Sequence, residues 1–373
     1  MVTFNEPKID SVIFISDVHF GVKNGSIDWL ENMKMYFMDF FIPYVKRIKK
    51  TNHPCVVVAG DYFDNRQFVD INVLNTALDI MELIAKECKV YMIIGNHDIY
   101  KSNDVDINSL RPLSYIKNVN IVHDIAELVI KNDKKFLLVS WIGDMKKENK
   151  IIAENKDKYD ILVFHTELSG MSYDNGRKII NGLNIDIVDD MRIVSGHIHK
   201  RQESKRGIYL GSPYHTSRMD IGNKKGIYTF FSEDDGLLTI SFTGNNISPE
   251  FILKRFSEVG RKAEDWKDIV HNNYVYIVFT TSELDVVNVT KFVNELQEYK
   301  PKDINIIEEK QVVNVNVDQA VVDGGGEVVD LSVKPDATIE EIFETKLRAF
   351  KLTKDQQKVI NKMNTDYLTQ ALS

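Results

Sequence analysis

The chain is 373 residues long and 43% hydrophobic, so it can bury a large core, and we expect two or three domains. No apolar run approaches the roughly 18 residues that a membrane helix needs, and charged residues among the first ten exclude the apolar core of a signal peptide. Cys55 and Cys88 form no C-x-x-C pair, which argues against a disulfide framework. We therefore expect a soluble, cytoplasmic protein.

Acidic residues outnumber basic ones, 55 to 47, and the formal charge is -8 at pH 7. A protein that binds nucleic acid by itself usually carries a basic excess or a basic face. The overall charge therefore argues against an independent nucleic-acid binder, although bound divalent cations would reverse the local potential in a cleft.

The first half of the chain alternates strand-like and helical patterns. Ser26 is placed to cap a long helix that runs through about Lys50. Its apolar stripe is expected in the core: Trp29, Met33, Phe37, Phe40, Phe41 and Tyr44. Residues 70–87 are predicted to form a second helix between two strands, which gives a β-α-β alternation. After residue 118 the pattern changes to strands, at 135–140, 208–210, 226–231 and 237–242.

A smaller unit is predicted to begin near residue 246, with strand 274–280, helix 286–299 and strands 305–307 and 312–317. Gly324-Gly325-Gly326 then interrupts the chain. Two S/T-x-x-E/Q capping boxes, at Thr338 and Thr353, predict a final pair of short helices. We therefore divide the chain into residues 1–245, 246–320, a linker at 321–337 and a helical hairpin at 338–373.

The hairpin carries two apolar stripes that it cannot bury fully by itself, so it is expected to dock on its own body or on a partner. The first stripe consists of Ile339, Ile342, Phe343, Leu347 and Phe350. The second consists of Val359, Ile360, Met363, Tyr367 and Leu368.

Five short apolar runs are each followed by residues that can bind a metal ion. We predict that they are buried strands, at 12–15, 55–59, 90–94, 161–164 and 193–194. The motifs that follow them are Asp17-Val18-His19, Gly60-Asp61, Gly95-Asn96-His97-Asp98, His165 and Gly196-His197-Ile198-His199. In open α/β sheets, sites form at the carboxyl ends of the strands, so these distant residues are expected to meet there.

Seven side chains are candidate metal ligands: Asp17, His19, Asp61, Asn96, His165, His197 and His199. Oxygen donors and imidazoles without a thiolate suit Mn²⁺, Fe²⁺ or Zn²⁺ better than a structural zinc site. Seven ligands exceed the need of one ion, and two ions about 3.5–4 Å apart clamp the oxygens of a phosphoryl displacement.

We expect Asp61 to be shared by the two ions. One ion is assigned to Asp17, His19, Asp61 and His199, and the other to Asp61, Asn96, His165 and His197. In a regular strand His197 and His199 would share one face, so each could reach one of two neighbouring ions.

His97 is the candidate general acid, because it follows a ligand and is therefore held at the site. Asp64 or Asp98 is expected to orient it. His215 lies close enough after the last motif to line the site, although its spacing does not demand it. Three other histidines lack such a context and are expected in loops or on the surface: His53, His123 and His271.

At these residues the sequence resembles the calcineurin-like metallophosphoesterases, whose motifs are D-x-H, G-D-x-x-D, G-N-H-[DE], a lone His and G-H-x-H. Within them it is most similar to the nuclease subunits of SbcCD-type DNA double-strand-break repair complexes, especially the bacteriophage recombination endonucleases. The added similarity lies at residues 16–21, 60–64, 165–168 and 211–213, and the resemblance covers about residues 8–245. Archaeal and eukaryotic relatives carry a histidine at the position of Asp64, so the role of that histidine cannot be transferred to Asp64.

The resemblance implies an α/β fold: a two-sheet sandwich flanked by helices, a small α/β cap domain and the C-terminal hairpin. It implies two Mn²⁺ ions, and DNA cut exonucleolytically at double-stranded ends and endonucleolytically in single strands. It also implies a homodimer within a heterotetramer, in which the hairpin stripes bind an SMC-like ATPase, and a host-cytoplasm location for a bacteriophage protein. The basic cluster after the last motif would contact DNA phosphates: Lys200, Arg201, Lys205 and Arg206.

Two alternatives remain open from the sequence. Phosphoprotein phosphatases share the metal motifs but carry G-D-x-x-D-R-G and G-N-H-E, whereas here Asp64 is followed by Asn65 and Asn96-His97 by Asp98. The second alternative is a scaffold that bridges DNA ends with little catalysis, against which the seven intact ligands argue.

Overall fold

The computed structural model of the chain describes residues 1–101, 104–188 and 193–309. The predicted strand 312–317, the glycine linker and the helical hairpin with its two stripes lie outside the described residues. Within the described part, every helix is too short or too polar to cross a membrane.

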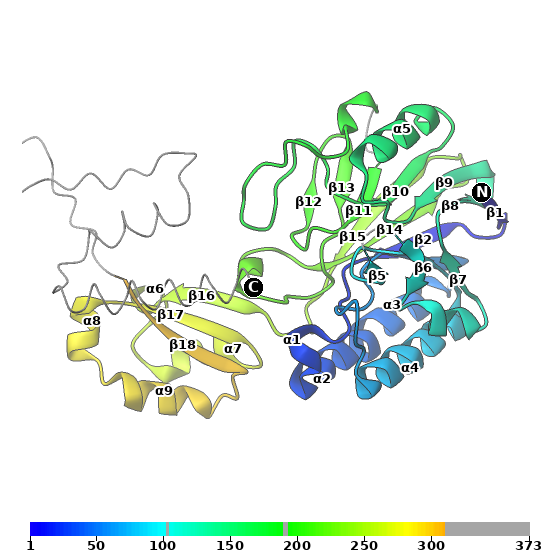
Figure 1. Cartoon of the computed structure of the whole chain (residues 1–373). Helices are drawn as coiled ribbons and strands as arrows, with labels where there is room; N and C mark the ends of the chain where they lie inside the picture. Colours follow the sequence, from blue (N-terminus) through cyan, green and yellow to red (C-terminus); the bar gives the residue numbers. More distant parts are fainter. Residues whose placement is uncertain (102–103, 189–192, 310–373) are drawn as a thin grey trace, which may run out of the picture. The chain divides into compact units, whose positions relative to one another are not determined.

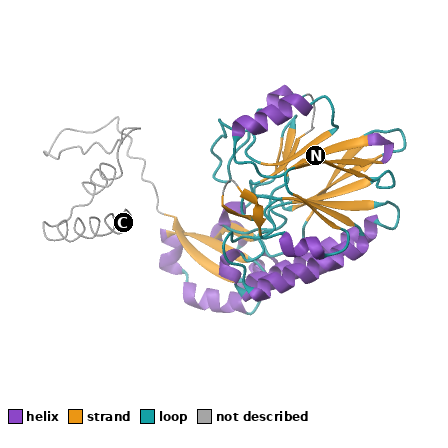
Figure 2. Cartoon of the chain, turned by 45° about the vertical axis from the view of Figure 1, so that its right-hand side comes forward, coloured by secondary structure: helices purple, strands orange, loops and turns teal. Residues whose placement is uncertain are grey.

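Two mixed β-sheets stack face to face (Figures 1 and 2). The six-stranded sheet contains, in spatial order, β15 (Leu238–Gly244), β14 (Gly226–Ser232), β2 (Ser11–Ile15), β3 (Pro54–Ala59), β4 (Lys89–Ile93) and β7 (Val119–Val122). The seven-stranded sheet contains β1 (Val2–Asn5), β8 (Ile125–Ile130), β9 (Lys134–Val139), β10 (Ile161–His165), β11 (Ile193–Gly196), β13 (Gly207–Tyr209) and β12 (Gln202–Glu203). The two-sheet α/β sandwich predicted from the sequence is confirmed.

The five predicted ligand-bearing strands are divided between the two sheets. β2, β3 and β4 are parallel neighbours in the six-stranded sheet, and β10 and β11 are parallel neighbours in the other. Their carboxyl ends therefore open on the same end of the sandwich. A small hairpin of β5 (Ile99–Lys101) and β6 (Asp104–Asn108) follows the loop after β4.

The core has three layers because the strands are buried on both faces. Along β2, Val12 and Phe14 pack between the sheets, while Ile13 and Ile15 pack against helices. This explains the continuous apolar runs in the sequence, since a strand covered on both sides has no polar face. On the outer face of the seven-stranded sheet, Leu162 and Ile193 pack with Ile152 of α5 (Met145–Asn155).

The helices that cover the six-stranded sheet are α2 (Ile27–Met35), α3 (Ile42–Ile48) and α4 (Ile71–Glu87), preceded by a short turn, α1 (Val22–Gly25) (Figure 1). The predicted helix at 70–87 is confirmed, and the carboxylate of Asp70 caps α4 by accepting from the amides of Asn72 and Val73. The predicted long helix differs in one respect: residues Tyr36–Phe41 form a π-helical segment between α2 and α3.

The predicted cap of that long helix is confirmed in its position but not in its hydrogen bond. Ser26 occupies the N-cap position of α2, but its side chain makes no capping hydrogen bond. The apolar stripe is confirmed in most positions, because Met33, Phe37, Phe41 and Tyr44 are buried and Phe40 packs partly buried against them. Packing of this stripe, more than capping, therefore holds the helix.

Residues 251–309 form a third sheet with its own apolar cluster. Its three parallel strands are β16 (Phe251–Arg255), β17 (Tyr274–Thr280) and β18 (Asp303–Glu309). Its helices are α6 (Phe256–Val259), α7 (Lys267–Val270), α8 (Thr281–Val286) and α9 (Val289–Gln297). Val275, Ile277 and Phe279 of β17 pack with Trp266 and Phe292 on the helical side.

The helix predicted at 286–299 is confirmed as α9, although it begins later, at Val289, where Asn288 caps it through the amide of Lys291. A separate helix that was not predicted, α8, precedes it and starts at Thr280 with a capping box. The third sheet contacts the body through Trp29 of α2, whose ring stacks on Phe251 at a centroid distance of 6.1 Å. The domain boundary placed near residue 245 stays a prediction.

Candidate metal centre

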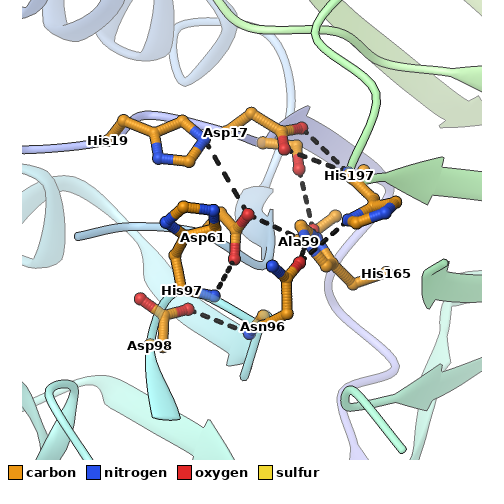
Figure 3. A network of polar contacts seen from close by, with 12 residues as sticks. Asp17, His19, Ala59, Asp61, Asn96, His97, Asp98, His165 and His197 are labelled. Carbon is orange, nitrogen blue, oxygen red and sulfur yellow. Dashed lines mark hydrogen bonds and ion pairs between the residues drawn. The ribbon is translucent and has the colours of Figure 1, made fainter. Parts of the chain in front are cut away.

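The loops after β2, β3, β4, β10 and β11 meet at one end of the sandwich, as Figure 3 shows for most of the candidate ligands. Asp17, His19, Asp61, Asn96 and His165 are buried, whereas His197 and His199 are half-buried. The structure thus brings together all seven candidate ligands from two different sheets.

Four of these residues have a left-handed backbone that non-glycine residues rarely adopt. The φ angles are 54° at Asp17, 52° at His19, 53° at Asp61 and 86° at His197. Such conformations cost about 1–3 kcal/mol each and persist only where the surrounding structure imposes them, typically at functional sites. Orienting these side chains therefore lowers the stability of the folded state.

The expectation that His197 and His199 project from a regular strand is wrong. β11 ends at Gly196, and the positive φ of His197 takes the chain out of extended conformation. The two imidazoles still reach different neighbours, because the Nδ1 of His197 lies 2.8 Å from Oδ1 of Asn96 and the Nε2 of His199 lies 2.9 Å from Nε2 of His19. The loop, and not strand alternation, separates them.

One group of ligand atoms surrounds Nε2 of His165. This nitrogen lies 3.1 Å from Oδ2 of Asp61 and 3.0 Å from Oδ1 of Asn96, which His197 also contacts. The Nδ1 of His165 lies 2.8 Å from the carbonyl oxygen of Ala59. Since a carbonyl only accepts, Nδ1 carries the hydrogen there and the Nε2 position faces the two oxygens.

A second group surrounds Nε2 of His19. It lies 2.9 Å from Nε2 of His199 and 3.8 Å from the same Oδ2 of Asp61. The ligand atoms of Asp17, His19 and His199 all lie within 4.8 Å of one another. Asp17 also accepts from the amide of His197, at 3.0 and 3.2 Å to its two oxygens. One carboxylate oxygen of Asp61 therefore lies between the two groups.

Both groups bring several electron-pair donors together at the centre of the site. Carboxylate and amide oxygens and imidazole lone pairs converge, and two Nε2 atoms face each other with at most one hydrogen between them. Divalent cations bound by oxygen and imidazole donors would satisfy these atoms. The residues present thus fit a dinuclear metal site.

The protonation of these groups follows from burial and mutual contact. Burial and the neighbouring His165 lower the pKa of His197 to about 3, and burial and His19 lower that of His199 to about 3. Burial alone would raise the pKa of Asp61, but His165 and His19 outweigh it and hold the pKa below its usual range. His197 and His199 are therefore neutral and Asp61 is ionised, which are the forms that bind metal.

His19 and His165 differ from the other two histidine ligands. Burial would lower the pKa of His19, but the carboxylates of Asp64 and Asp61 outweigh this effect and raise it. Burial would also lower the pKa of His165, but the carboxylates of Asp61 and Asp17 outweigh this effect and raise the pKa to about 9. Without a metal, a proton on Nε2 of His165 would thus lie beside these carboxylates. A divalent cation would displace that proton when it binds.

Two glycines are required for the close approach of these loops. A Cβ at Gly95 would collide with the amide and carboxylate of Asp61, and a Cβ at Gly60 would collide with the ring of His165. Gly60 also has a φ of 87°, which favours glycine. The glycines of the G-D and G-N-H-D motifs therefore serve the packing of the site.

His97 is half-buried beside this centre and is oriented by main-chain contacts. Its amide donates to Oδ1 of Asp61 at 2.8 Å, and its Nδ1 lies 2.7 Å from the carbonyl oxygen of Asp64. Asp64 thus contacts His97 through its main chain. Its carboxylate lies 3.2 Å from Nδ1 of His19 instead.

The expectation that Asp98 orients His97 is corrected by the contacts of its carboxylate. Asp98 is fully buried and accepts from the amides of Tyr62, Phe63 and Gly95. Burial and the nearby Asp61 raise its pKa to about 7. Asp98 therefore ties the loop after β3 to the loop after β4.

Three residues near His197 were not singled out as site residues in the sequence. The ring of Trp141 lies 5.3 Å from that of His197, and Oε1 of Glu167 lies 4.0 Å from its Nε2. The hydroxyl of Tyr173 donates to the other oxygen of Glu167 at 2.8 Å. Glu167 follows His165 by two positions, which was the one available signal; no sequence pattern indicated Trp141 or Tyr173.

The predicted DNA-binding cluster is not uniform. Arg201 pairs with Glu203 and lies over the ring of Phe242, and Arg206 pairs with Asp186. Lys200 and Lys205 form no ion pair within the described part of the chain. The two lysines are therefore the more available cations of the cluster.

The remaining histidines are placed as follows. His53, His123 and His271 are exposed, as predicted. His215 is buried, its Nδ1 accepts from the amide of Phe251, and its Nε2 donates to the carbonyl oxygen of Asn223. It therefore links the body to β16.

Comparisons with known proteins agree with this geometry. A sequence model of the family described as calcineurin-like phosphoesterase matches residues 11–201. The chain is 28% identical to protein 078R of Invertebrate iridescent virus 3, which is named as a phosphoesterase. The match covers 53% of this chain and 56% of that protein. The chain is 25% identical to exonuclease subunit 1 of Enterobacteria phage T4 over 77% of this chain and 80% of that protein.

A third relative is the DNA double-strand break repair protein Mre11 of Methanococcus maripaludis, 25% identical over 51% of each chain. The chain thus spans about half the length of two of these three relatives. The family match, by contrast, covers just over half of this chain and contains all seven candidate ligands. The chain therefore belongs to the calcineurin-like phosphoesterases, a family of hydrolases whose fold uses a dinuclear metal site.

Proposed function

We propose that this protein is a Mn²⁺-dependent DNA nuclease that cuts double-stranded ends exonucleolytically and single strands endonucleolytically, in repair, recombination or replication. The observation that carries the proposal is the position of Asp61, whose one oxygen faces His165 at 3.1 Å and His19 at 3.8 Å. The names of two relatives, an exonuclease subunit and a double-strand-break repair protein, support DNA as the substrate.

The residues of the two groups would hold the ions. Asp17, His19 and His199 would hold one, Asn96, His165 and His197 would hold the other, and Asp61 would contact both. When bound, two divalent cations supply positive charge to the phosphate oxygens and make water more acidic. The buried carboxylates and the Nδ1 contact of His165 with Ala59 fix these ligands before the substrate arrives.

His97 would protonate the leaving oxygen. With Nδ1 donating to the carbonyl oxygen of Asp64, the ring is fixed and Nε2 is left to carry the proton for the substrate. The same carbonyl accepts equally well from the charged imidazolium, so the acid form keeps its orientation. A positioned acid of this kind contributes about 10²–10⁴ in rate.

A substrate panel tests the proposal. We expect the purified protein with Mn²⁺ to degrade double-stranded DNA from its ends, nick single-stranded DNA and hydrolyse bis(p-nitrophenyl) phosphate. A chelator should abolish these activities, and added Mn²⁺ should restore them. Rapid hydrolysis of a phosphopeptide with intact DNA would favour the phosphoprotein phosphatase instead, and Mn²⁺ binding without any hydrolysis would favour the scaffold.

We also propose that the C-terminal hairpin binds an SMC-like ATPase. Removing residues 337–373 should leave Mn²⁺-dependent nicking of single-stranded DNA largely unchanged, because every candidate ligand precedes residue 200. Co-purification with the cognate ATPase should fall sharply, since the two apolar stripes would supply the buried anchors of that interface. The homodimer within a heterotetramer stays a prediction.

A matched control for the truncation keeps the hairpin and changes only its stripes. Phe343→Glu with Met363→Glu should reduce co-purification as the truncation does, while nicking persists. If the truncated chain and the double variant both co-purified with the ATPase as efficiently as the full-length wild type, the partner contact would lie outside the hairpin.

A further inference from the structure

A buried ion pair lies beneath the last ligand motif. Lys225 is 4% exposed and Asp220 is 3% exposed, and Nζ of Lys225 lies 2.5 Å from Oδ1 of Asp220. Lysine and aspartate are almost never fully buried unless they are paired. Neither residue belongs to the metal motifs, so this pair requires a separate explanation.

The contacts of Lys225 point to the backbone of a candidate ligand. Its ammonium group donates to the carbonyl oxygen of His199 at 2.6 Å and to the hydroxyl of Ser212 at 3.0 Å. With Asp220, these partners use all three donors of the ammonium group. The carbonyl of His199 also accepts from the amide of Ser212 at 3.0 Å, so two donors fix it.

Asp220 is anchored as firmly as Lys225. Its Oδ2 accepts from the amide of Thr216 at 2.8 Å and from the amide of Ser217 at 3.1 Å. The hydroxyl of Thr216 donates to the same oxygen. Asp220 thus connects Lys225 to Thr216 and Ser217. These two residues directly follow residues 211–215, which we call the 211–215 turn.

The 211–215 turn also reaches the opposite loop of the same ligand group. The hydroxyl of Tyr214 donates to the carbonyl oxygen of Val18 at 2.5 Å, and Val18 lies between Asp17 and His19. Ser212 and Lys225 hold one side of this group, and Tyr214 holds the other. The turn therefore spans the two loops that supply Asp17, His19 and His199.

The other ligand group is supported differently. His165 is fixed by the carbonyl oxygen of Ala59, and its neighbours are Asn96 and Asp61. Among the hydrogen bonds of the described residues, those of Lys225 and the 211–215 turn reach neither Asn96 nor His165. Loss of Lys225 should therefore affect one metal ion more than the other.

We infer that Lys225 is a positioning residue for the metal ion held by Asp17, His19 and His199, and that it acts by fixing the main chain of His199. This inference rests on the proposed two-metal function. It assigns Lys225 no contact with the substrate or the reacting atoms.

The test compares Lys225→Met with Lys224→Met. Methionine keeps the length of the lysine side chain but removes its donors, and Lys224 is the exposed neighbour that serves as the control. Calorimetric titration of the full chain with Mn²⁺ should show two sites in the wild type and in Lys224→Met. In Lys225→Met one site should weaken by about tenfold or more, as loss of supporting contacts typically does, while the other keeps its affinity.

Electron paramagnetic resonance of the same samples supplies a second readout. At a Mn²⁺ concentration that fills both wild-type sites, Lys225→Met should show isolated Mn²⁺ where the wild type shows a spin-coupled pair. A purely structural role for Lys225 would lower the melting temperature without this site-selective change.

A double variant covers the case in which Lys225→Met does not fold. Lys225→Met with Asp220→Asn leaves no unpaired buried charge and keeps an acceptor for the amides of Thr216 and Ser217. It should show the same selective loss of one Mn²⁺ site. Two sites of wild-type affinity in either folded variant would overturn the inference, whereas fewer than two sites in the wild type would count against the proposed function itself.

Discussion

Replacing Asp61 by asparagine is expected to weaken both metal sites and to lower Mn²⁺-dependent DNA cleavage by more than about 100-fold, the upper end of what supporting residues of a metal site cost. The physical reason is the loss of the one charged oxygen that faces both His165 and His19. The fold should persist, because asparagine has the same shape and keeps Oδ1 as the acceptor for the amide of His97. Calorimetric Mn²⁺ titration and a DNA cleavage assay measure the two effects.

Asp79→Asn is the matched control, since Asp79 is exposed on α4. It should bind two ions and cut DNA as the wild type does. If Asp61→Asn also bound two Mn²⁺ ions with wild-type affinity, Asp61 could not be the ligand that both ions share.

Replacing His97 by alanine is expected to lower DNA cleavage by about 10²–10⁴, the usual cost of losing a general acid. Binding of two Mn²⁺ ions should be retained, because the contact of His97 with Asp61 runs through its main-chain amide, which alanine keeps. Single-turnover cleavage rates and metal titration should therefore separate the chemistry from metal binding.

The leaving group provides a sharper test of His97. p-Nitrophenolate departs without a proton, so His97→Ala should lose much less activity on bis(p-nitrophenyl) phosphate than on DNA. His123→Ala, at an exposed histidine, should behave as the wild type on both substrates. Equal losses on the two substrates would mean that His97 acts on substrate binding or on the metals and not as an acid.

The ligand-bearing strands were predictable because each is covered on both faces. A strand such as β3 has no polar face, so its sequence is a continuous apolar run that ends abruptly at Gly60 and Asp61. The seven candidate ligands could likewise be chosen from the sequence, because the ability to bind a metal ion is a property of the side chain itself. The helix predicted at 286–299 was placed too early at its start, because α9 begins after its cap at Asn288 and a separate short helix, α8, ends directly before it.

The sequence by itself determined the ligand-bearing strands and the identity of the candidate ligands, since residue type and spacing report burial and donor chemistry. The two-sheet fold was implied by the resemblance of the motifs to a known family. Only the tertiary structure decided how those ligands are aimed. Local preference opposes the left-handed backbone of Asp17, His19, Asp61 and His197. Contacts between loops hold it, since the amide of Asp17 donates to the carbonyl oxygen of Gly60 and that of His19 donates to the carbonyl oxygen of Asp61. The support of His199 by Lys225 likewise joins segments that no sequence period connects, so it becomes visible only when the chain is folded.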